Sequence, residues 1–161
     1  MKKLITVESL FFLFLLFVSG CTTEPEYNNT SKPVVKKTSV NYTREAFRIS
    51  FPDTFSLKYI SNAYSNNYSE DKRNKLIDYM RDEVSKLGED ANIFENILSQ
   101  TGCKLTGEYV LPTYAERAKY ENQEVWIFQV TYGLGDPVFG RCKCFVFGLT
   151  NLDTLAYIAS R

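Results

Sequence analysis

Three cysteines are the residues best suited to chemistry in the body of this 161-residue chain. Cys142 and Cys144 are two residues apart in a segment predicted to be a strand, so their side chains share one face of it. In an oxidising compartment we expect Cys103 to pair with Cys142 or Cys144, closing a loop of about 40 residues and stabilising the fold by about 4 kcal/mol. A bridge between Cys142 and Cys144 is disfavoured, because same-face neighbours in a strand are about 7 Å apart.

This pairing leaves one thiol over, and three interpretations compete for it. In the first interpretation the unpaired thiol is a small buried hydrophobic group. In the second it is a redox or thiol-reactive site on Cys142 or Cys144, and in the third it is part of a metal site. Arg141 and Lys143 flank the pair and would favour a reactive thiolate only if they turned to the same face of the strand. The chain has neither a Cys-x-x-Cys spacing nor a histidine, so we expect no metal and no cofactor.

Composition excludes several classes of function. The absence of histidine removes Ser/His and Cys/His dyads and the commonest general base near neutral pH, so an enzyme is not expected. Lys plus Arg and Asp plus Glu both number 19, so no charge excess points to nucleic acid. The acidic residues that follow the predicted helices are expected to be ordinary solvated charges: Glu116, Glu121, Glu124 and Asp136.

A polar and aromatic stretch over 61–68 is the candidate contact surface. Rigid aromatic rings beside small hydrogen-bonding groups suit a saccharide or protein partner, and a solvated loop is the alternative. The predicted binding residues of this stretch are Tyr64, Asn66, Asn67 and Tyr68. Trp126 alternates with apolar residues along its own segment and is predicted to lie in the core instead.

Two helices are predicted to position these groups. The first begins after Ser69, a capping residue followed by acidic residues, and ends at Gly88. The second begins after Asp90 and ends at Gly102. Their apolar residues recur at helical spacing: Leu76, Ile77, Met80, Val84 and Leu87 in the first, and Ile93, Phe94, Ile97 and Leu98 in the second.

Strands are predicted on both sides of the helices. Apolar and polar residues alternate over 47–51 and, after a Pro-Asp turn, over 55–59, which predicts a hairpin. Four further segments predict an antiparallel meander: Leu105–Leu111, Val125–Tyr132, Arg141–Leu149 and Leu155–Ser160. We therefore expect an α+β domain in which an antiparallel β-sheet packs against two helices. This two-layer plan resembles cystatin-like rolls, and the opening Phe-Arg-Ile-Ser-Phe-Pro resembles that of PsbP-like domains.

The N-terminus has the architecture of a secretory signal. Lys2 and Lys3 precede an apolar run of nine residues, Leu10–Val18, whereas a membrane-spanning helix needs about 20. The stretch Val18-Ser19-Gly20-Cys21 resembles the lipobox of bacterial lipoproteins. The resemblance implies cleavage before Cys21, a diacylglyceryl thioether on its sulfur, and acylation of the new amino terminus, for example by palmitate. In a Gram-negative host, Thr22 in place of Asp after Cys21 implies the outer membrane.

Three parts of the chain follow from these patterns. Residues 1–20 are the predicted lipoprotein signal peptide, and residues 44–161 a single α+β globular domain. Between them, residues 21–43 are polar, aperiodic and interrupted by prolines, which predicts a lipidated flexible tether with a reach of about 25 Å.

These features predict a lipid-anchored protein of the bacterial cell envelope that acts as a binding or scaffolding domain. Its expected partners are the membrane, through the lipid anchor, and an envelope protein or saccharide. The alternative is a thiol-redox or thiol-dependent enzyme of the envelope that uses Cys142 or Cys144. A structural lipoprotein that stabilises a larger envelope complex is the third hypothesis.

Overall fold

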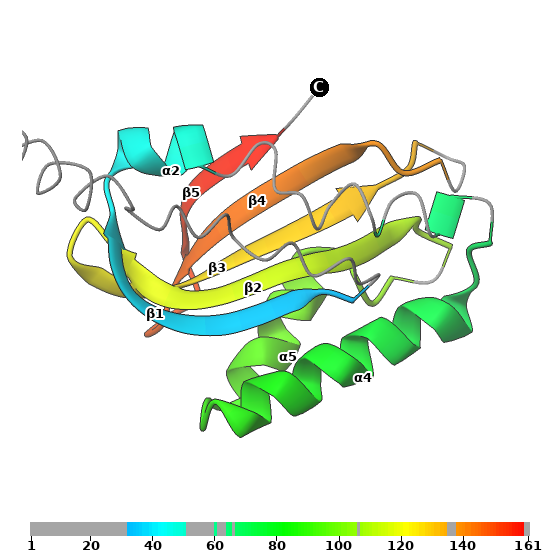
Figure 1. Ribbon diagram of the computed structural model, residues 1–161, viewed down its shortest axis with the longest axis horizontal. Helices are drawn as coiled ribbons and strands as arrows, with labels where there is room; N and C mark the ends of the chain where they lie inside the picture. Colours follow the sequence, from blue (N-terminus) through cyan, green and yellow to red (C-terminus); the bar gives the residue numbers. More distant parts are fainter. Residues whose placement is uncertain are drawn as a thin grey trace, which may run out of the picture.

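A computed structural model describes residues 32–50, 60, 64–65, 67–105, 107–134 and 138–159. The predicted signal peptide, Cys21 and Asn66 lie outside these residues. Figure 1 shows a five-stranded sheet with two helices, α4 and α5, against one face and a short helix, α2, on the other side. The expected α+β class, with a sheet packed against two helices, is confirmed.

The two predicted helices are present with their predicted caps. α4 spans Glu70–Lys86 and α5 spans Ala91–Gln100. The side chains of Ser69 and Asp90 each accept a hydrogen bond from a backbone N–H of the first turn. Gly88 has a φ of 73°, a left-handed conformation that glycine adopts at little cost, and it lets the chain turn between the helices.

Four strands after the helices form the antiparallel meander. They are β2 (Val110–Tyr120), β3 (Gln123–Tyr132), β4 (Arg141–Gly148) and β5 (Thr154–Ala159). They pair in chain order, each antiparallel to the next. The first of them was predicted at 105–111, which is too early. The paired strand begins at Val110 and continues through the mixed polar and apolar sequence up to Tyr120, where alternation is a weak signal.

A fifth strand corrects the predicted boundary of the tether. β1 spans Val34–Tyr42 and pairs in parallel with β2, from Val34 opposite Tyr114 to Tyr42 opposite Tyr120. The interpretation of 21–43 as a flexible tether is therefore wrong for its last part. β1 is polar because it is an edge strand with both faces partly exposed, and its hydrogen-bond partner is remote in sequence.

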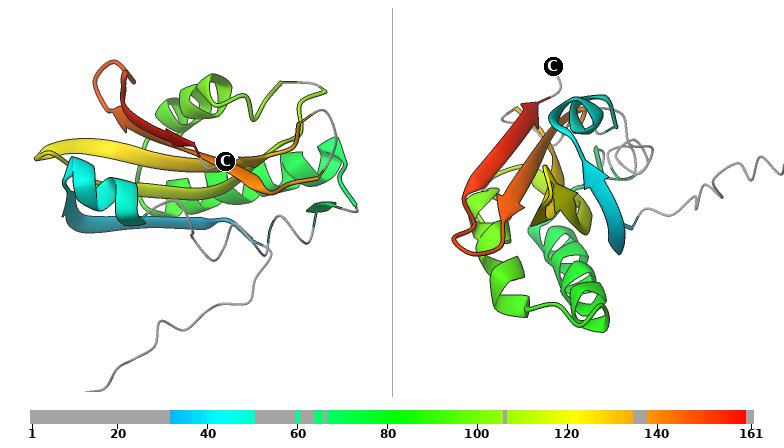
Figure 2. Two further views of the ribbon diagram at one scale, coloured as in Figure 1. Left: turned by 90° about the horizontal axis from the view of Figure 1, so that it is seen from above. Right: turned by 90° about the vertical axis from the view of Figure 1, so that its left-hand side faces the viewer.

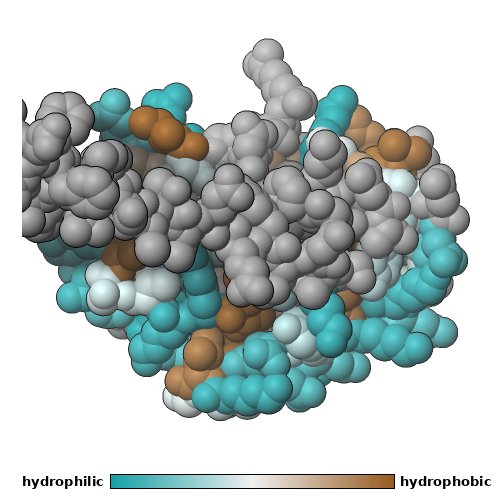
Figure 3. All heavy atoms as spheres, viewed as in Figure 1, coloured by the Kyte–Doolittle hydropathy of each residue, from teal (hydrophilic) through white to brown (hydrophobic). Residues whose placement is uncertain are grey.

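The predicted strand over 47–51 is a helix as far as the structure describes it. α2 spans Arg44–Ser50, and the Thr43 hydroxyl accepts a 3.2 Å hydrogen bond from the N–H of Ala46 at its start. Only Phe47 of this helix is buried, whereas Ile49 is 75% exposed. Figure 3 shows the corresponding hydrophobic surface over α2. The second half of the predicted hairpin, 55–59, lies outside the described residues.

Apolar clusters lie on both faces of the sheet. On the helix side, the largest buried residues belong to α4, α5, β3 and β4: Met80, Phe94, Ile97, Leu98, Trp126, Phe128 and Phe147. On the opposite face, Phe47 packs with residues from every strand of the meander: Tyr114, Ala118, Tyr120, Val125, Ile127, Cys144 and Val146, with Ala156 and Ile158 beside them. Figure 2 shows α4 and α5 on one side of the curved sheet and α2 on the other.

Among the described residues, no helix is both long and apolar enough to cross a membrane.

Candidate functional site

The predicted disulfide from Cys103 is wrong in this structure. Cys103 follows α5 and lies in the helix-side cluster, whereas Cys144 lies in the cluster on the opposite face, and both carry free thiols. Alternation along β4 places Cys142 on the same face as Cys144. The sheet therefore stands between Cys103 and the other two sulfurs.

None of the three thiols has the environment of a nucleophile. Cys103, Cys142 and Cys144 are at most 2% exposed. Burial raises the pKa of Cys103 to about 12, against smaller opposing effects of the Thr101 hydroxyl and Arg73. Burial, and then the nearby Cys142 and Glu116, raise the pKa of Cys144 well above its ordinary value. A reactive thiolate needs exposure and a lowered pKa, so the geometry favours the interpretation of these thiols as small hydrophobic groups.

The polar aromatic stretch before α4 mainly packs against the domain. The Tyr68 hydroxyl donates a 3.1 Å hydrogen bond to the carbonyl of Glu108, and its ring contacts Tyr109 and Phe139. Tyr64 packs against the same small cluster of buried residues. Of the three predicted binding residues that the structure describes, Tyr64, Asn67 and Tyr68, only Asn67 is exposed. Trp126 is 1% exposed, so its prediction as a core residue is confirmed.

A buried carboxylate, Glu116, corrects the prediction that it is a solvated charge. Its side chain is fully buried on β2, on the sheet face opposite α4 and α5. Its oxygens accept hydrogen bonds from the hydroxyls of Thr38, at 2.6 Å, Tyr42, at 3.1 Å, and Tyr114. Lys36 forms an ion pair with it at 3.7 Å.

The Glu116 cluster fastens β1 to the sheet. Burial, together with the adjacent carboxylate, raises the pKa of both Tyr42 and Tyr114, so both phenols remain protonated donors at all physiological pH values. Because Glu116 has no contact with solvent, the cluster is suited to structure and not to turnover of a substrate. Its signal in the sequence is the alternation of Tyr114, Glu116 and Ala118 on one face, in a stretch that the prediction left outside the strand.

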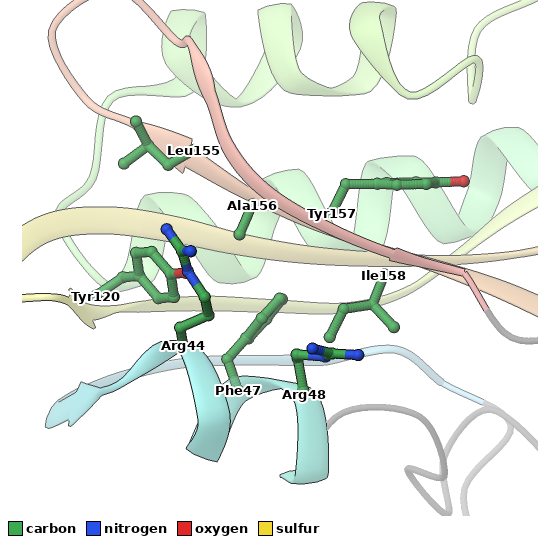
Figure 4. A pocket seen from close by; sticks show the side chains of 8 residues that line it. All are labelled: Arg44, Phe47, Arg48, Tyr120, Leu155, Ala156, Tyr157 and Ile158. Carbon is green, nitrogen blue, oxygen red and sulfur yellow. The ribbon is translucent and has the colours of Figure 1, made fainter.

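An open groove of about 350 Å³ between α2 and β5 is the strongest candidate for a binding site (Figure 4). Its lining comes from α2, from the end of β2 and from β5: Arg44, Phe47, Arg48, Tyr120, Leu155, Ala156, Tyr157 and Ile158. The four consecutive residues Leu155–Ile158 of β5 all line the groove. Because successive side chains of a strand point to opposite faces, this wall is formed by the edge of β5 and not by one of its faces. Nothing local in the sequence brings α2 and β5 together.

The opposite wall of this α2–β5 groove presents two guanidinium groups over an apolar floor. Arg44 and Arg48 are exposed and turn towards β5 from one side of α2, as Figure 4 shows. No ion pair within the described part of the chain involves either arginine. Phe47 is 1% exposed and meets the ring of Tyr120 edge-on, with centroids 5.8 Å apart.

The β2–β3 turn fixes the position of α2. Glu121 and Asn122 form this turn with φ angles of 49° and 66°. The Glu121 carboxylate accepts a 2.7 Å hydrogen bond from the backbone N–H of Arg44, and Asn122 exchanges two hydrogen bonds with Asn41 at the end of β1. The guanidinium of Arg44 is thus carried on a backbone that is held in place at its first residue.

A second groove, of about 380 Å³, flanks β5 on the helix side of the sheet. Its lining runs from the end of α5 to the starts of β2 and β4: Gln100, Thr101, Gly102, Leu105, Glu108, Val110, Lys143, Phe145 and Tyr157. Tyr157, half exposed, belongs to both grooves. β5 therefore separates an arginine-lined groove from one of mixed lining, in which apolar side chains lie beside Glu108 and Lys143.

In the portions of the chain described above, no group of three or more Cys, Asp or Glu side chains is placed to hold a metal ion. A scan of protein-family models, a search of curated proteins and a search of solved structures each found no match to this chain.

Proposed function

We propose that this chain is a lipid-anchored protein of the bacterial envelope whose α+β domain binds a partner in the α2–β5 groove. The lipobox residues around Cys21 support the anchor, and Thr22 favours the outer membrane in a Gram-negative host. The observation that carries the binding function is the pair of exposed arginines facing the open edge of β5.

The start of β1 limits how far this lipid-anchored domain can lie from the membrane. Twelve residues separate Cys21 from Val34, the first residue of β1. Fully extended, they span about 40 Å at most. A partner in the groove must therefore lie near the membrane that carries the anchor, which favours another envelope component over a freely diffusing molecule.

The chemistry of the α2–β5 groove suits binding more than catalysis. The lining residues that the structure describes include no carboxylate and no thiol, and arginine cannot act as a general base. Guanidinium groups bind carboxylates and phosphates through paired hydrogen bonds, and the apolar floor can receive a hydrocarbon portion of the same ligand. We therefore place an anionic group of the partner opposite Arg44 and Arg48.

Site-directed photo-crosslinking in the native envelope tests this function. A photoreactive amino acid replaces Leu155 in the full chain, and the same amino acid at Lys75, exposed on α4, is the matched control. We expect a discrete crosslinked species from position 155 only, and its loss when Arg48→Glu is added. Equal crosslinking from both positions, or a species that Arg48→Glu leaves intact, contradicts the proposal.

A further inference from the structure

We infer that the partner is an extended peptide segment of another envelope protein, which pairs with β5 as a sixth strand and places acidic side chains against Arg44 and Arg48. This inference rests on the proposed function and names the chemistry of its partner. Strand addition at a sheet edge obtains affinity from main-chain hydrogen bonds and specificity from the grooves that receive alternate side chains.

The first support is the contrast between the two edges of the sheet. β5 pairs with β4 alone among the described strands, and in an antiparallel pair every second residue turns its N–H and C=O to the outer edge. Natural proteins protect such edges with charges or proline, as Lys36 and Lys37 do on β1. β5 carries neither charge nor proline in its six residues, and Leu155 and Tyr157 are 37% and 50% exposed.

The second support is the spacing of the two arginines. Residues four apart on a helix have Cβ atoms about 5–6 Å apart. Residues two apart on an extended peptide are about 6.6 Å apart, a close match to that distance. In Figure 4 the line from Arg44 to Arg48 follows β5 from Leu155 towards Ile158. Two carboxylates at positions i and i+2 of the added strand would therefore each meet one guanidinium group.

The third support is the groove on the other face of β5. Side chains between the two acidic ones would point to the helix side of the sheet, because a strand alternates its faces. There Leu105, Phe145 and Tyr157 form the apolar part of the second groove, with Leu105 55% exposed, and Glu108 and Lys143 add one charge of each sign to its lining. The recognised segment thus alternates acidic and apolar residues.

Binding of two capped heptapeptides to the full chain, purified from membranes in detergent, tests the charge pattern. The first is Thr-Val-Glu-Val-Glu-Val-Thr and the second has lysine in place of both glutamates. By fluorescence anisotropy we expect the glutamate peptide to bind and the lysine peptide not to. Arg48→Glu should weaken binding roughly tenfold, and Lys75→Glu, which changes the net charge equally, should leave it unchanged. Equal binding of both peptides overturns the inference.

Single N-methylation at each position of the glutamate peptide tests strand pairing itself. Methylation of an N–H that faces β5 removes a main-chain hydrogen bond, whereas methylation of the next N–H does not. We expect losses of roughly tenfold at every second position and little change between them. Uniform losses, or none, overturn the pairing.

Two further outcomes separate this inference from the proposed function. If crosslinking from position 155 in the envelope depends on Arg48 while no peptide binds, the partner is not an extended strand, and only the inference fails. If neither crosslinking nor peptide binding occurs, both fail. A stable dimer in sedimentation velocity that Tyr157→Lys dissociates also overturns the inference, because a second copy of the chain would then occupy the edge of β5.

Discussion

The carboxylate of Glu89, in the turn between α4 and α5, accepts a 2.9 Å hydrogen bond from Nε of Arg117 on β2. Its other oxygen lies 2.7 Å from Nζ of Lys37 on β1. One side chain thus joins the helical layer to two neighbouring strands. Arg117 also donates a 2.8 Å hydrogen bond to the carbonyl of Val125 on β3.

The Glu89 contact predicts how stability depends on pH. Burial alone would raise the pKa of Glu89, but hydrogen bonds from Lys37 and Arg117 outweigh it and hold the pKa below its ordinary value. A depressed folded-state pKa contributes stability above the unfolded-state pKa of about 4.3, and this stability is lost as the pH falls through the folded-state pKa. In urea unfolding, we expect Glu89→Gln to lose about 1–3 kcal/mol at pH 7.

At acidic pH the difference between Glu89→Gln and the parent should shrink, because the parent carboxyl is then protonated. A difference that stays constant from pH 7 to pH 3 would contradict this account. Asp82→Asn is the matched control, since Asp82 is an exposed carboxylate on α4 that forms no ion pair with any residue the structure describes. It should change stability by no more than about 0.5 kcal/mol.

Removal of the Glu116 carboxylate should destabilise the domain more than the Glu89→Gln substitution does. Glu116→Ala leaves the Thr38, Tyr42 and Tyr114 hydroxyls without their acceptor, and we expect the free energy of unfolding to fall by about 3 kcal/mol or more. Glu116→Gln keeps one acceptor oxygen and should lose less than Glu116→Ala. Urea denaturation measures both, and equal stability of Glu116→Ala and the parent would refute the role of this cluster.

The buried thiols should be inert while the domain is folded. An alkylating reagent at neutral pH should leave Cys103 and Cys144 unmodified in native protein and modify them once urea unfolds it, as peptide mass spectrometry would show. Rapid alkylation of Cys144 in the native protein would instead favour the thiol-enzyme hypothesis.

The lipid anchor has a direct test in cells. If the proposed lipidation is right, Cys21→Ala should abolish incorporation of radiolabelled palmitate, because it removes the sulfur that the lipobox predicts to receive the diacylglyceryl group. Cys103→Ala is the matched control and should incorporate label normally. Persistent labelling of Cys21→Ala would rule out lipidation at this residue.

Local patterns predicted the helices well and the edges of the sheet poorly. The caps at Ser69 and Asp90 and the helical spacing of apolar residues are contained in short windows, so α4 and α5 follow from sequence. The alternation of apolar and polar residues over 47–51 was too short to predict a strand reliably. The segment instead forms the helix α2, which Thr43 caps and which buries one residue, Phe47. β1 is polar and obtains its order from β2, far along the chain.

Local sequence patterns could not predict the candidate site either, because it is formed by segments that are remote in sequence. Its walls, α2 and β5, are separated by more than half of the chain, and neither carries a recognisable motif. The burial of Glu116 likewise depends on Thr38 and Tyr42, which reach it only after β1 pairs with β2. Such sites arise from tertiary pairing, which residue spacing within one segment does not encode.

The parallel pairing of β1 with β2 also determines how the domain resists a pulling force. A load that enters the chain at its N-terminal side and acts along β1 meets the hydrogen bonds to β2 in shear, so these bonds bear it together and not one after another. The hydroxyls of Thr38 and Tyr42, held by Glu116, add transverse cross-links at the same junction. Traction from the N-terminal side is thereby spread over the sheet, while β5, one wall of the α2–β5 groove, lies at the opposite edge of the sheet from β1.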